Sequence, residues 1–307
     1  MRAVRIHDYG PPEVLVIEQV PRPEPGEGEV LVRVHAAGVN PIDWKLRRGD
    51  MRAFRPLQFP VTPGFDLAGT VEAAGAGVTA FQPGQAVFGS GSGAYAEYAV
   101  APAANLAAMP RNLTFDQAAA VPIGARTAWT ALFDAAGLQP GQRLLVNGAA
   151  GGVGHFAVQL GRWKGAHVSG TASTANVEFV RSLGADEVVD YTATPVEQAV
   201  RDVDVVLDTV GGPGIQRLLQ VLKPGGVIVT IAGQVPEGAA QERGVRVARP
   251  TPPPSPGALL QQIASLIEAG TIRPVAGRVF PLEEVRQAHA LSETGHGRGR
   301  IVLHVRD

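Results

Sequence analysis

The sequence of 307 residues contains no cysteine. This absence excludes disulfide bonds, thiolate nucleophiles and every zinc site that depends on sulfur ligands. Chemistry in this chain must therefore rely on oxygen and nitrogen side chains, on a bound cofactor, or on both.

An excess of charge of either sign is also missing. The 27 Lys and Arg nearly balance the 28 Asp and Glu and are scattered, so there is no basic patch to attract nucleic acid or an anionic membrane. No apolar run approaches the roughly 18 residues of a membrane helix, and the first ten residues carry no apolar signal segment. We expect a cytoplasmic protein with small-molecule partners, bound to neither nucleic acid nor membrane.

Aromatic residues are few, with four Tyr and three Trp, but 45% apolar and 18% charged residues are ordinary for a folded chain. The length exceeds what one hydrophobic core usually supports, so we expect two domains. Glycine, in contrast, is abundant at 38 residues, which predicts many tight turns or close backbone approaches.

The first part of the chain, residues 1–122, reads as short strands broken by Gly and Pro. Helical patterns there are limited to residues 41–49 and to the segment after Thr114, a cap residue with Gln117 three positions on. We expect a β-rich domain.

From residue 123 strands alternate with helices. Apolar strand patterns cover 143–147, 166–171, 203–208 and 226–233, with helix-period residues between them. This alternation predicts an α/β fold with a doubly wound parallel sheet.

The run RPTPPPSPG at 249–257 has five prolines and is read as a rigid connector. A helix over 258–269 follows, and the chain from 273 returns to a strand pattern. We expect the last strand to rejoin the first sheet, which gives domains at 1–122 and 123–272 and a return segment at 273–307.

A glycine-rich turn, NGAAGGVG at 147–154, stands between a predicted strand and a helix, as in dinucleotide-binding turns. Gly151 would let the backbone approach a pyrophosphate and Gly154 would allow close packing of helix on strand, while Ala149 replaces the first glycine of the pattern. Turns at DTVGG (208–212) and TIAG (230–233) follow two other predicted strands. Such turns also serve plain connections, but this context favours a cofactor.

The sequence resembles the zinc-free quinone oxidoreductase, or zeta-crystallin-like, branch of the medium-chain dehydrogenase/reductase superfamily. The resemblance rests on AAGVNPIDWKLRRG (36–49), TPGFDLAGTV (62–71), the glycine turn, RSLGADEVVDY (181–191) and GRGRIVL (297–303). It implies a GroES-like substrate domain, a Rossmann domain, and an active site associated with both.

The resemblance also implies an absence of zinc. Zinc-dependent relatives use Cys where this chain has Asn40, and His-Glu where it has Phe65 and Asp66; the latter two are read here as a core aromatic and a turn carboxylate. Without a Lewis acid, alcohol oxidation is disfavoured, whereas hydride addition to a quinone or enone gives a delocalised anion that needs only a modest proton donor.

For catalysis the resemblance points to Asn40, Asp43 and Lys45. Asn40 could bond the substrate oxygen, hold the nicotinamide ribose or cap a turn. Asp43 could cap the following helix or orient a neighbour, and Lys45 could polarise a carbonyl or lie exposed. Tyr95 is read as packing, and His155 as a surface or supporting residue.

NADPH is the expected cofactor, because the position about 20 residues beyond Gly151 is neutral and Ser173 and Asn176 offer donors to a 2′-phosphate without a competing carboxylate. Both residues could instead cap the next helix. The resemblance adds Tyr191 as a phosphate contact. The full set of expected cofactor contacts is Thr127, Ala149, Gly151, Gly152, Val153, Gly154, Ser173, Asn176, Tyr191, Val210 and Ala232.

These features predict an NADPH-dependent, metal-free reductase of quinones or conjugated enones that acts as a homodimer. Two alternatives stay open: a double-bond reductase of 2-alkenals or ketols, and a non-catalytic protein that binds NADPH.

Overall fold

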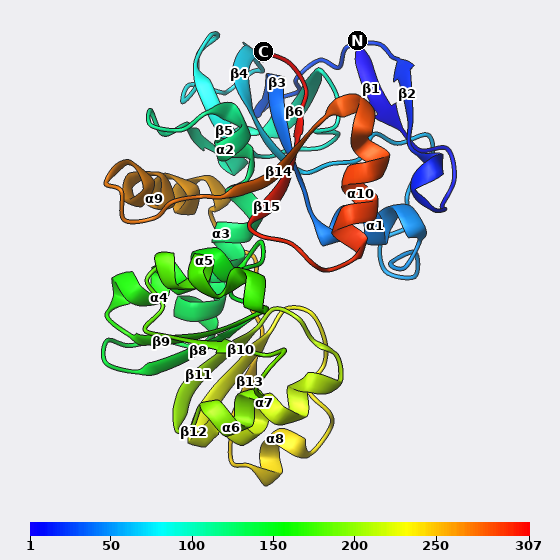
Figure 1. The fold of residues 1–307 in the computed structure, drawn as a ribbon. Helices are drawn as coiled ribbons and strands as arrows, with labels where there is room; N and C mark the ends of the chain where they lie inside the picture. The colour runs from blue at the N-terminus through cyan, green and yellow to red at the C-terminus, as the bar shows by residue number, and fades with distance from the viewer. The chain divides into compact units, whose positions relative to one another are not determined.

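The computed structural model describes all residues 1–307, which form two compact units (Figure 1). The first unit comprises Met1–Ile123, Pro254–Gly270 and Pro274–Asp307, and the second comprises Gly124–Pro253 and Thr271–Arg273. The fold class expected from the sequence, with one doubly wound α/β unit and one β-rich unit, is confirmed.

A seven-stranded sheet forms the centre of the first unit, in the order β14-β15-β3-β4-β5-β7 with β6 also paired to β3. A separate antiparallel pair, β1 and β2, completes its strands. The strands are β1 (Arg2–Arg5), β2 (Val16–Gln19), β3 (Glu29–Val39), β4 (Asp66–Ala74), β5 (Ala86–Ser90), β6 (Tyr98–Pro102), β7 (Leu106–Ala108), β14 (Ala276–Pro281) and β15 (Arg300–His304).

The local sequence explains the ends of α1 and the start of α2 in this unit. Helix α1 (Pro41–Arg48) starts with proline and ends at Gly49, whose φ of +83° lies in the left-handed region that glycine tolerates. Helix α2 (Phe115–Ala119) follows Thr114, whose Oγ1 accepts a hydrogen bond from the backbone N–H of Gln117 at 3.2 Å, while Gln117 Oε1 accepts from the Thr114 N–H at 3.0 Å. This is the capping box that the sequence predicts.

The remaining helical segments of the first unit are α9 (Pro256–Glu268), α10 (Val285–Glu293), and the short 3-10 turns η1 (Pro12–Val14), η2 (Ala103–Asn105) and η6 (Leu282–Glu284).

The last strand does rejoin the first sheet. Strand β15 pairs antiparallel with β3, with Leu303 opposite Ala37. One boundary differs from the expected ranges: α9, placed within 123–272 by sequence, groups with the first unit. Its packing is the reason, because a Cβ on Gly257 would lie 2.4 Å from the carbonyl oxygen of Leu106 in β7.

The second unit is a six-stranded parallel sheet in the order β10-β9-β8-β11-β12-β13. The order reverses between β8 and β11, where ligands of such sheets bind. Helices α4 and α5 lie on one face and α6, α7 and α8 on the other (Figure 1). The strands are β8 (Arg143–Asn147), β9 (His167–Ala172), β10 (Glu187–Asp190), β11 (Val203–Asp208), β12 (Leu222–Thr230) and β13 (Arg246–Ala248).

Helix α3 (Pro122–Trp129) leads into this unit and continues as a π-helix, η3 (Thr130–Ala135). The other helical segments of the unit are α4 (Gly154–Lys164), η4 (Thr174–Asn176), α5 (Val177–Ser182), α6 (Val196–Ala199), η5 (Gly212–Gly214), α7 (Ile215–Val221) and α8 (Ala239–Glu242).

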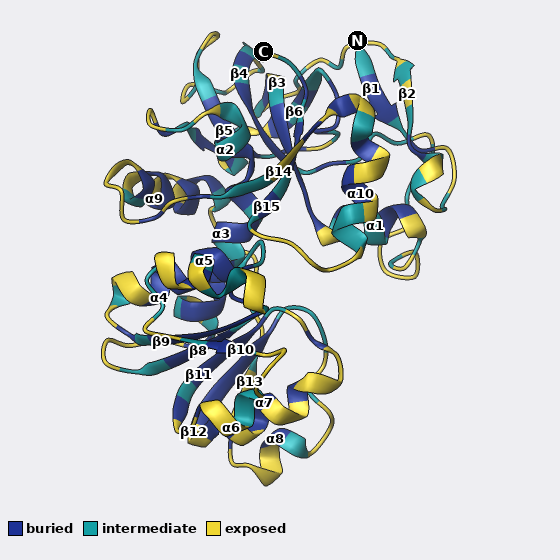
Figure 2. Ribbon diagram, in the orientation of Figure 1, coloured by how far each residue is buried: buried dark blue, intermediate teal, exposed yellow.

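Each sheet carries its own hydrophobic core (Figure 2). Val32, Val34 and Leu67 are among the fully covered side chains of the first core, and Leu145, Val206 and Ile228 among those of the second. The longest helix has 13 residues, and none of the helices combines the length and the apolar character that crossing a bilayer requires.

Candidate functional site

Polar side chains at the carboxyl ends of four parallel strands bond to one another in the second unit. Asp208, at the end of β11, accepts from Asn147 Nδ2 of β8 at 2.8 Å and from Thr230 Oγ1 of β12 at 3.3 Å. Thr171 Oγ1 of β9 donates to Asn147 Oδ1 at 2.7 Å. The chain of bonds spans the point where strand order reverses. Sequence reasoning missed it, although the polar residues ending four apolar strands were a usable signal.

The glycine-rich turn is anchored to this chain of bonds. The Gly148 N–H donates to Thr171 Oγ1 at 3.0 Å, and Gly148 has a φ of +80°. A Cβ on Gly154 would lie 2.1 Å from the Gly148 carbonyl oxygen, and one on Gly151 would lie 3.3 Å from it. The turn thus needs Gly154 for close packing of α4, as the sequence predicts. A glycine turn that leads into a helix N-terminus fits the pyrophosphate of a dinucleotide.

Ala149, Gly152 and Val153 also belong to this turn. Ala149 is fully buried, and its Cβ lies 2.8 Å from where a Cβ on Gly170 would stand. The carbonyl oxygen of Gly152 lies 2.5 Å from where a Cβ on Gly124 would stand. Val153 precedes α4. His155, expected at the surface or in a supporting place, is wholly buried, with Nδ1 2.9 Å from the Gly151 carbonyl oxygen; the surface interpretation is wrong because α4 packs this side against the turn.

The residues expected near a 2′-phosphate meet after β9. Asn176 Nδ2 donates to Ser173 Oγ at 3.2 Å, and the Tyr191 N–H donates to the Ala172 carbonyl at 3.1 Å. The Tyr191 side chain is 51% exposed. The structure therefore brings Ser173, Asn176 and Tyr191 to one loop region.

This loop region also holds a carboxylate, so the expectation that none competes there is wrong. Asp190, the last residue of β10, accepts from Thr174 Oγ1 and from Thr192 Oγ1, each at 2.6 Å. These hydroxyls hold the pKa of Asp190 below its usual value. An anion therefore stands beside Ser173 and Tyr191.

The other expected cofactor residues occupy turns and one helix. Thr127 is half-buried in α3, and its carbonyl accepts from Thr130 Oγ1 at 3.4 Å. Val210 is 61% exposed in the turn after β11. A Cβ on Gly211 would lie 2.1 Å from the Ala232 carbonyl oxygen, so the turns after β11 and β12 touch. The contacts of these residues with a cofactor stay predictions.

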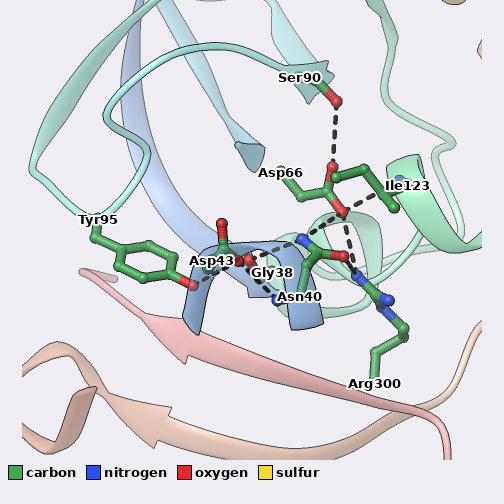
Figure 3. A network of polar contacts seen from close by, with 8 residues as sticks. All are labelled: Gly38, Asn40, Asp43, Asp66, Ser90, Tyr95, Ile123 and Arg300. Atoms are coloured by element: carbon green, nitrogen blue, oxygen red, sulfur yellow. Dashed lines mark hydrogen bonds and ion pairs between the residues drawn. The ribbon is translucent and has the colours of Figure 1, made fainter. Parts of the chain in front are cut away.

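A buried polar cluster surrounds Asn40 in the first unit (Figure 3). Asn40 Nδ2 donates to Asp66 Oδ2 at 3.2 Å and to the Gly38 carbonyl at 3.4 Å, and Arg300 Nη2 donates to Asn40 Oδ1. Arg300 also pairs with Asp66 Oδ2 at 3.2 Å. The Asn40 amide is thus held by strands β4 and β15, which neither the turn-cap nor the substrate interpretation anticipated.

Asp66 is the centre of this cluster rather than a turn carboxylate, so that interpretation is wrong. It is fully buried at the start of β4 and also accepts from Ser90 Oγ and from the Ile123 N–H, both at 3.1 Å. Phe65 is only half-buried, with the Arg55 guanidinium 4.9 Å from its ring centre, and is not a core aromatic.

Of the two carboxylate oxygens of Asp43, one accepts hydrogen bonds and the other accepts none. Its Oδ2 accepts from the Asn40 N–H at 2.7 Å, which is the capping role, and from the Tyr95 hydroxyl at 2.9 Å. Its Oδ1 is buried without a hydrogen-bond partner. Burial raises the pKa of Asp43 to about 7, against the lowering effect of those two donors. Tyr95, read as packing, is therefore also the partner of a functional candidate.

Lys45 lies outside this cluster. It is half-buried in α1, with its ammonium 5.5 Å from the Trp44 ring centre. Nowhere in the chain do three or more His, Asp or Glu side chains gather closely enough to hold a metal ion.

A cavity of about 170 Å³ adjoins Asp43 within the first unit. Its wall is largely apolar, with two arginines. The residues that line it are Ile6, Asp43, Leu46, Arg47, Arg55, Leu57, Val61, Thr62, Pro63, Gly64, Phe65, Ser92 and Gly93.

Comparison with known proteins matches both parts of the chain. Residues 26–111 match the alcohol dehydrogenase GroES-like domain and residues 183–303 the zinc-binding dehydrogenase family. The chain is 37% identical to the mouse (Mus musculus) mitochondrial NAD(P)H oxidoreductase RTN4IP1, over 90% of this chain and 82% of that one. It is 34% identical to the 2-methylene-furan-3-one reductase of Solanum lycopersicum, over 99% and 79%.

Solved structures of similar proteins have the same fold as this chain. The quinone oxidoreductase of Coxiella burnetii is 33% identical and superposes with a TM-score of 0.90 over 100% of this chain and 99% of that one. A mycobacterial protein solved in complex with NADPH is 29% identical, with a TM-score of 0.91 over 99% and 100%.

Proposed function

Because this chain belongs to the zinc-free quinone oxidoreductase branch of the medium-chain dehydrogenase/reductase superfamily, an oxidoreductase family that uses nicotinamide dinucleotides, we propose that it reduces quinones or conjugated enones with NADPH. The observation that carries the proposal is the glycine turn, where a Cβ on Gly154 would collide with the Gly148 carbonyl at 2.1 Å. This close packing of α4 on the turn places the helix N-terminus where turns of this kind hold a pyrophosphate.

The residues proposed to hold the cofactor are those of the glycine turn, with Ser173, Asn176 and Tyr191 toward the 2′-phosphate. Two of these three are linked to each other through the Asn176–Ser173 hydrogen bond, and Tyr191 leaves half of its surface open. Preference for NADPH over NADH should be moderate, because Asp190 places a negative charge in the same region and no Lys or Arg occurs at 171–176.

When bound, the nicotinamide supplies a hydride. The protein must then hold an electron-poor acceptor and stabilise or protonate the oxyanion that results. Asn40 and Asp43 are proposed for these tasks, and Lys45 for polarising a carbonyl at a greater distance from the cluster.

The test is to follow NADPH and NADH absorbance against a panel of quinones and enones. We expect turnover with several acceptors. Gly154→Val should abolish both turnover and the thermal stabilisation by NADPH, whereas Gly297→Val, where a side chain meets open space, should keep both. Binding of NADPH without turnover on any acceptor would favour a non-catalytic role.

We further propose a homodimer that acts in the cytoplasm, although one relative is named as mitochondrial. Light scattering should give twice the 32.0 kDa of one chain, and a single-chain mass would refute the dimer.

A further inference from the structure

Two buried oxygens from separate elements of the first unit converge on one nitrogen. Arg300 Nη2 donates to Asn40 Oδ1 and, at 3.2 Å, to Asp66 Oδ2 (Figure 3). None of these three residues is more than 4% exposed. Oxygens gathered around a single positive group are the arrangement that a buried cation requires. Here the cation is a guanidinium.

A metal ion does not fit these residues, although the match to the zinc-binding dehydrogenase family implies zinc. Zinc needs about three or four protein ligands with free lone pairs at roughly 2.0–2.3 Å. The Asp66 carboxylate instead accepts hydrogen bonds from Arg300 Nη2 and Asn40 Nδ2, both at 3.2 Å, and from Ser90 Oγ and the Ile123 N–H, both at 3.1 Å. Donors therefore engage the lone pairs that a metal would use.

The charges of the cluster also suit one guanidinium. Arg300 forms an ion pair with Asp66. The other buried acid of the cluster is Asp43, whose pKa burial raises to about 7, so it is largely neutral below that pH. A single positive charge balances Asp66, whereas a divalent ion would leave an excess of positive charge in a buried region, which is costly.

We infer that Arg300 is the built-in cation of this cluster and holds the place between Asn40 and Asp66 that a divalent metal ion would otherwise take. A guanidinium keeps its charge at every pH at which proteins fold. It belongs to the chain, so no chelator removes it, and it offers no vacant coordination position to a water or an alcohol. The charge and geometry of the cluster thus do not depend on the supply of metal.

The first experiment asks whether a metal ion can replace the guanidinium. Arg300→Met leaves the Asp66 carboxylate buried without its cation. After dialysis against a chelator, added Zn²⁺ should raise the Tm of this variant by about 4 °C when its concentration is 100 times the Kd. The wild type and Arg22→Met, which loses an exposed ion pair with Glu72 instead, should show no such rise. Arg300→Met/Asp66→Asn should show none either, because the carboxylate is gone.

The second experiment reports on binding at this cluster alone. The chain has no cysteine, so a cobalt–thiolate absorption band in Asn40→Cys can arise only at position 40. Co²⁺ should bind Asn40→Cys/Arg300→Met at least about tenfold more tightly than Asn40→Cys, in which the guanidinium still repels the metal. Asn40→Cys/Arg300→Lys, which keeps a positive charge, should bind Co²⁺ as weakly as Asn40→Cys.

The inference is overturned if Zn²⁺ stabilises Arg300→Met/Asp66→Asn as much as Arg300→Met, if Co²⁺ binds Asn40→Cys equally with and without Arg300, or if no variant that lacks Arg300 binds either metal. Should Arg300→Met be unfolded in metal-free buffer, Zn²⁺ is expected to restore its near-UV circular dichroism, and a failure to do so also overturns the inference. None of these measurements uses turnover, so their outcome is separate from that of the proposed reductase activity.

Discussion

Asn40 uses its side-chain oxygen and nitrogen within the protein: it donates to Asp66 and Gly38 and accepts from Arg300. An amide held on two sides presents the neighbouring backbone and Asp43 in a fixed position. Its contribution to catalysis should therefore come through positioning as much as through substrate contact.

Replacing Asn40 tests this. Asn40→Ala should lower kcat about 10²-fold and reduce the free energy of unfolding by about 1–3 kcal/mol, because Arg300 and Asp66 each lose a buried partner. Lys45→Ala should leave stability nearly unchanged, since Lys45 is outside the cluster, while lowering kcat more than it weakens NADPH binding. Wild-type kinetics in both variants would assign Asn40 and Lys45 no catalytic role.

Cofactor preference gives a second prediction at the level of single residues. Ser173→Asp should penalise NADPH selectively, whereas Asp190→Asn should increase the ratio of kcat/KM with NADPH to that with NADH, because a negative charge near the 2′-phosphate is removed. Glu187→Gln, which removes the same charge at the other end of β10, is the matched control. Equal use of both cofactors by the native protein would contradict the assignment of this loop.

Strand β15 is held to the sheet by a side-chain ion pair as well as by backbone hydrogen bonds. Arg300, its first residue, is 4% exposed and reaches Asn40 of the β3–α1 junction and Asp66 of β4. The ion pair thus joins a strand from the end of the chain to two elements from its beginning.

Breaking the Arg300–Asp66 ion pair should lower the stability of the fold strongly. Arg300→Met leaves Asp66 as an uncompensated buried charge, and the free energy of unfolding should fall by about 3–5 kcal/mol. Arg22→Met, which breaks the exposed pair with Glu72, should cost no more than about 1 kcal/mol. Adding Asp66→Asn to Arg300→Met should restore part of the loss in chemical denaturation, and a failure to do so would argue against the charge as the cause.

Local patterns were sufficient for most elements and for the glycine turn. Strands β8 and β11 follow their apolar runs to the residue, and Thr114 with Gln117 marks the start of α2. What the sequence could not give was pairing between distant residues. Asp66 meets Arg300 across 234 positions, and Asp190 approaches Ser173 only because β10 lies beside β9.

At the scale of the whole molecule the first prediction concerns metal. No cysteine occurs in the sequence, and Asn40 and Asp66 are committed to Arg300 rather than open to a cation. Purified protein should contain no stoichiometric zinc and keep its activity in a strong chelator. About one zinc per chain by elemental analysis, lost together with activity, would contradict this.

Stability should depend on pH through two buried groups, the basic His289 and the acidic Asp43. His289 has its pKa lowered from 6.5 to about 3 by burial and by Arg47, so the unfolded chain binds a proton that the folded one does not, and stability is lost as pH falls through this window. Asp43, with its pKa raised from 3.8 to about 7, favours the folded state at low pH and loses that contribution as pH rises from 3.8 to 7.

Urea unfolding at a series of pH values separates the two. His289→Phe should flatten the loss of stability below pH 6.5, and Asp43→Asn should flatten the loss on the way up to pH 7. If neither variant changes the pH dependence, these groups are not its source.

The return of the chain to its first sheet sets an order for assembly during synthesis. Strand β3 lacks its neighbour β15 until residues 300–304 have left the ribosome, whereas residues 124–253 include every strand of the second sheet. The second unit can thus close while residues 36–39 of β3 in the first unit still lack this partner. An unpaired strand edge is a site for mispairing between chains, so the nascent protein is most exposed to aggregation until β15 has emerged, and substitutions that weaken β15 should reduce yield more than their share of the core implies.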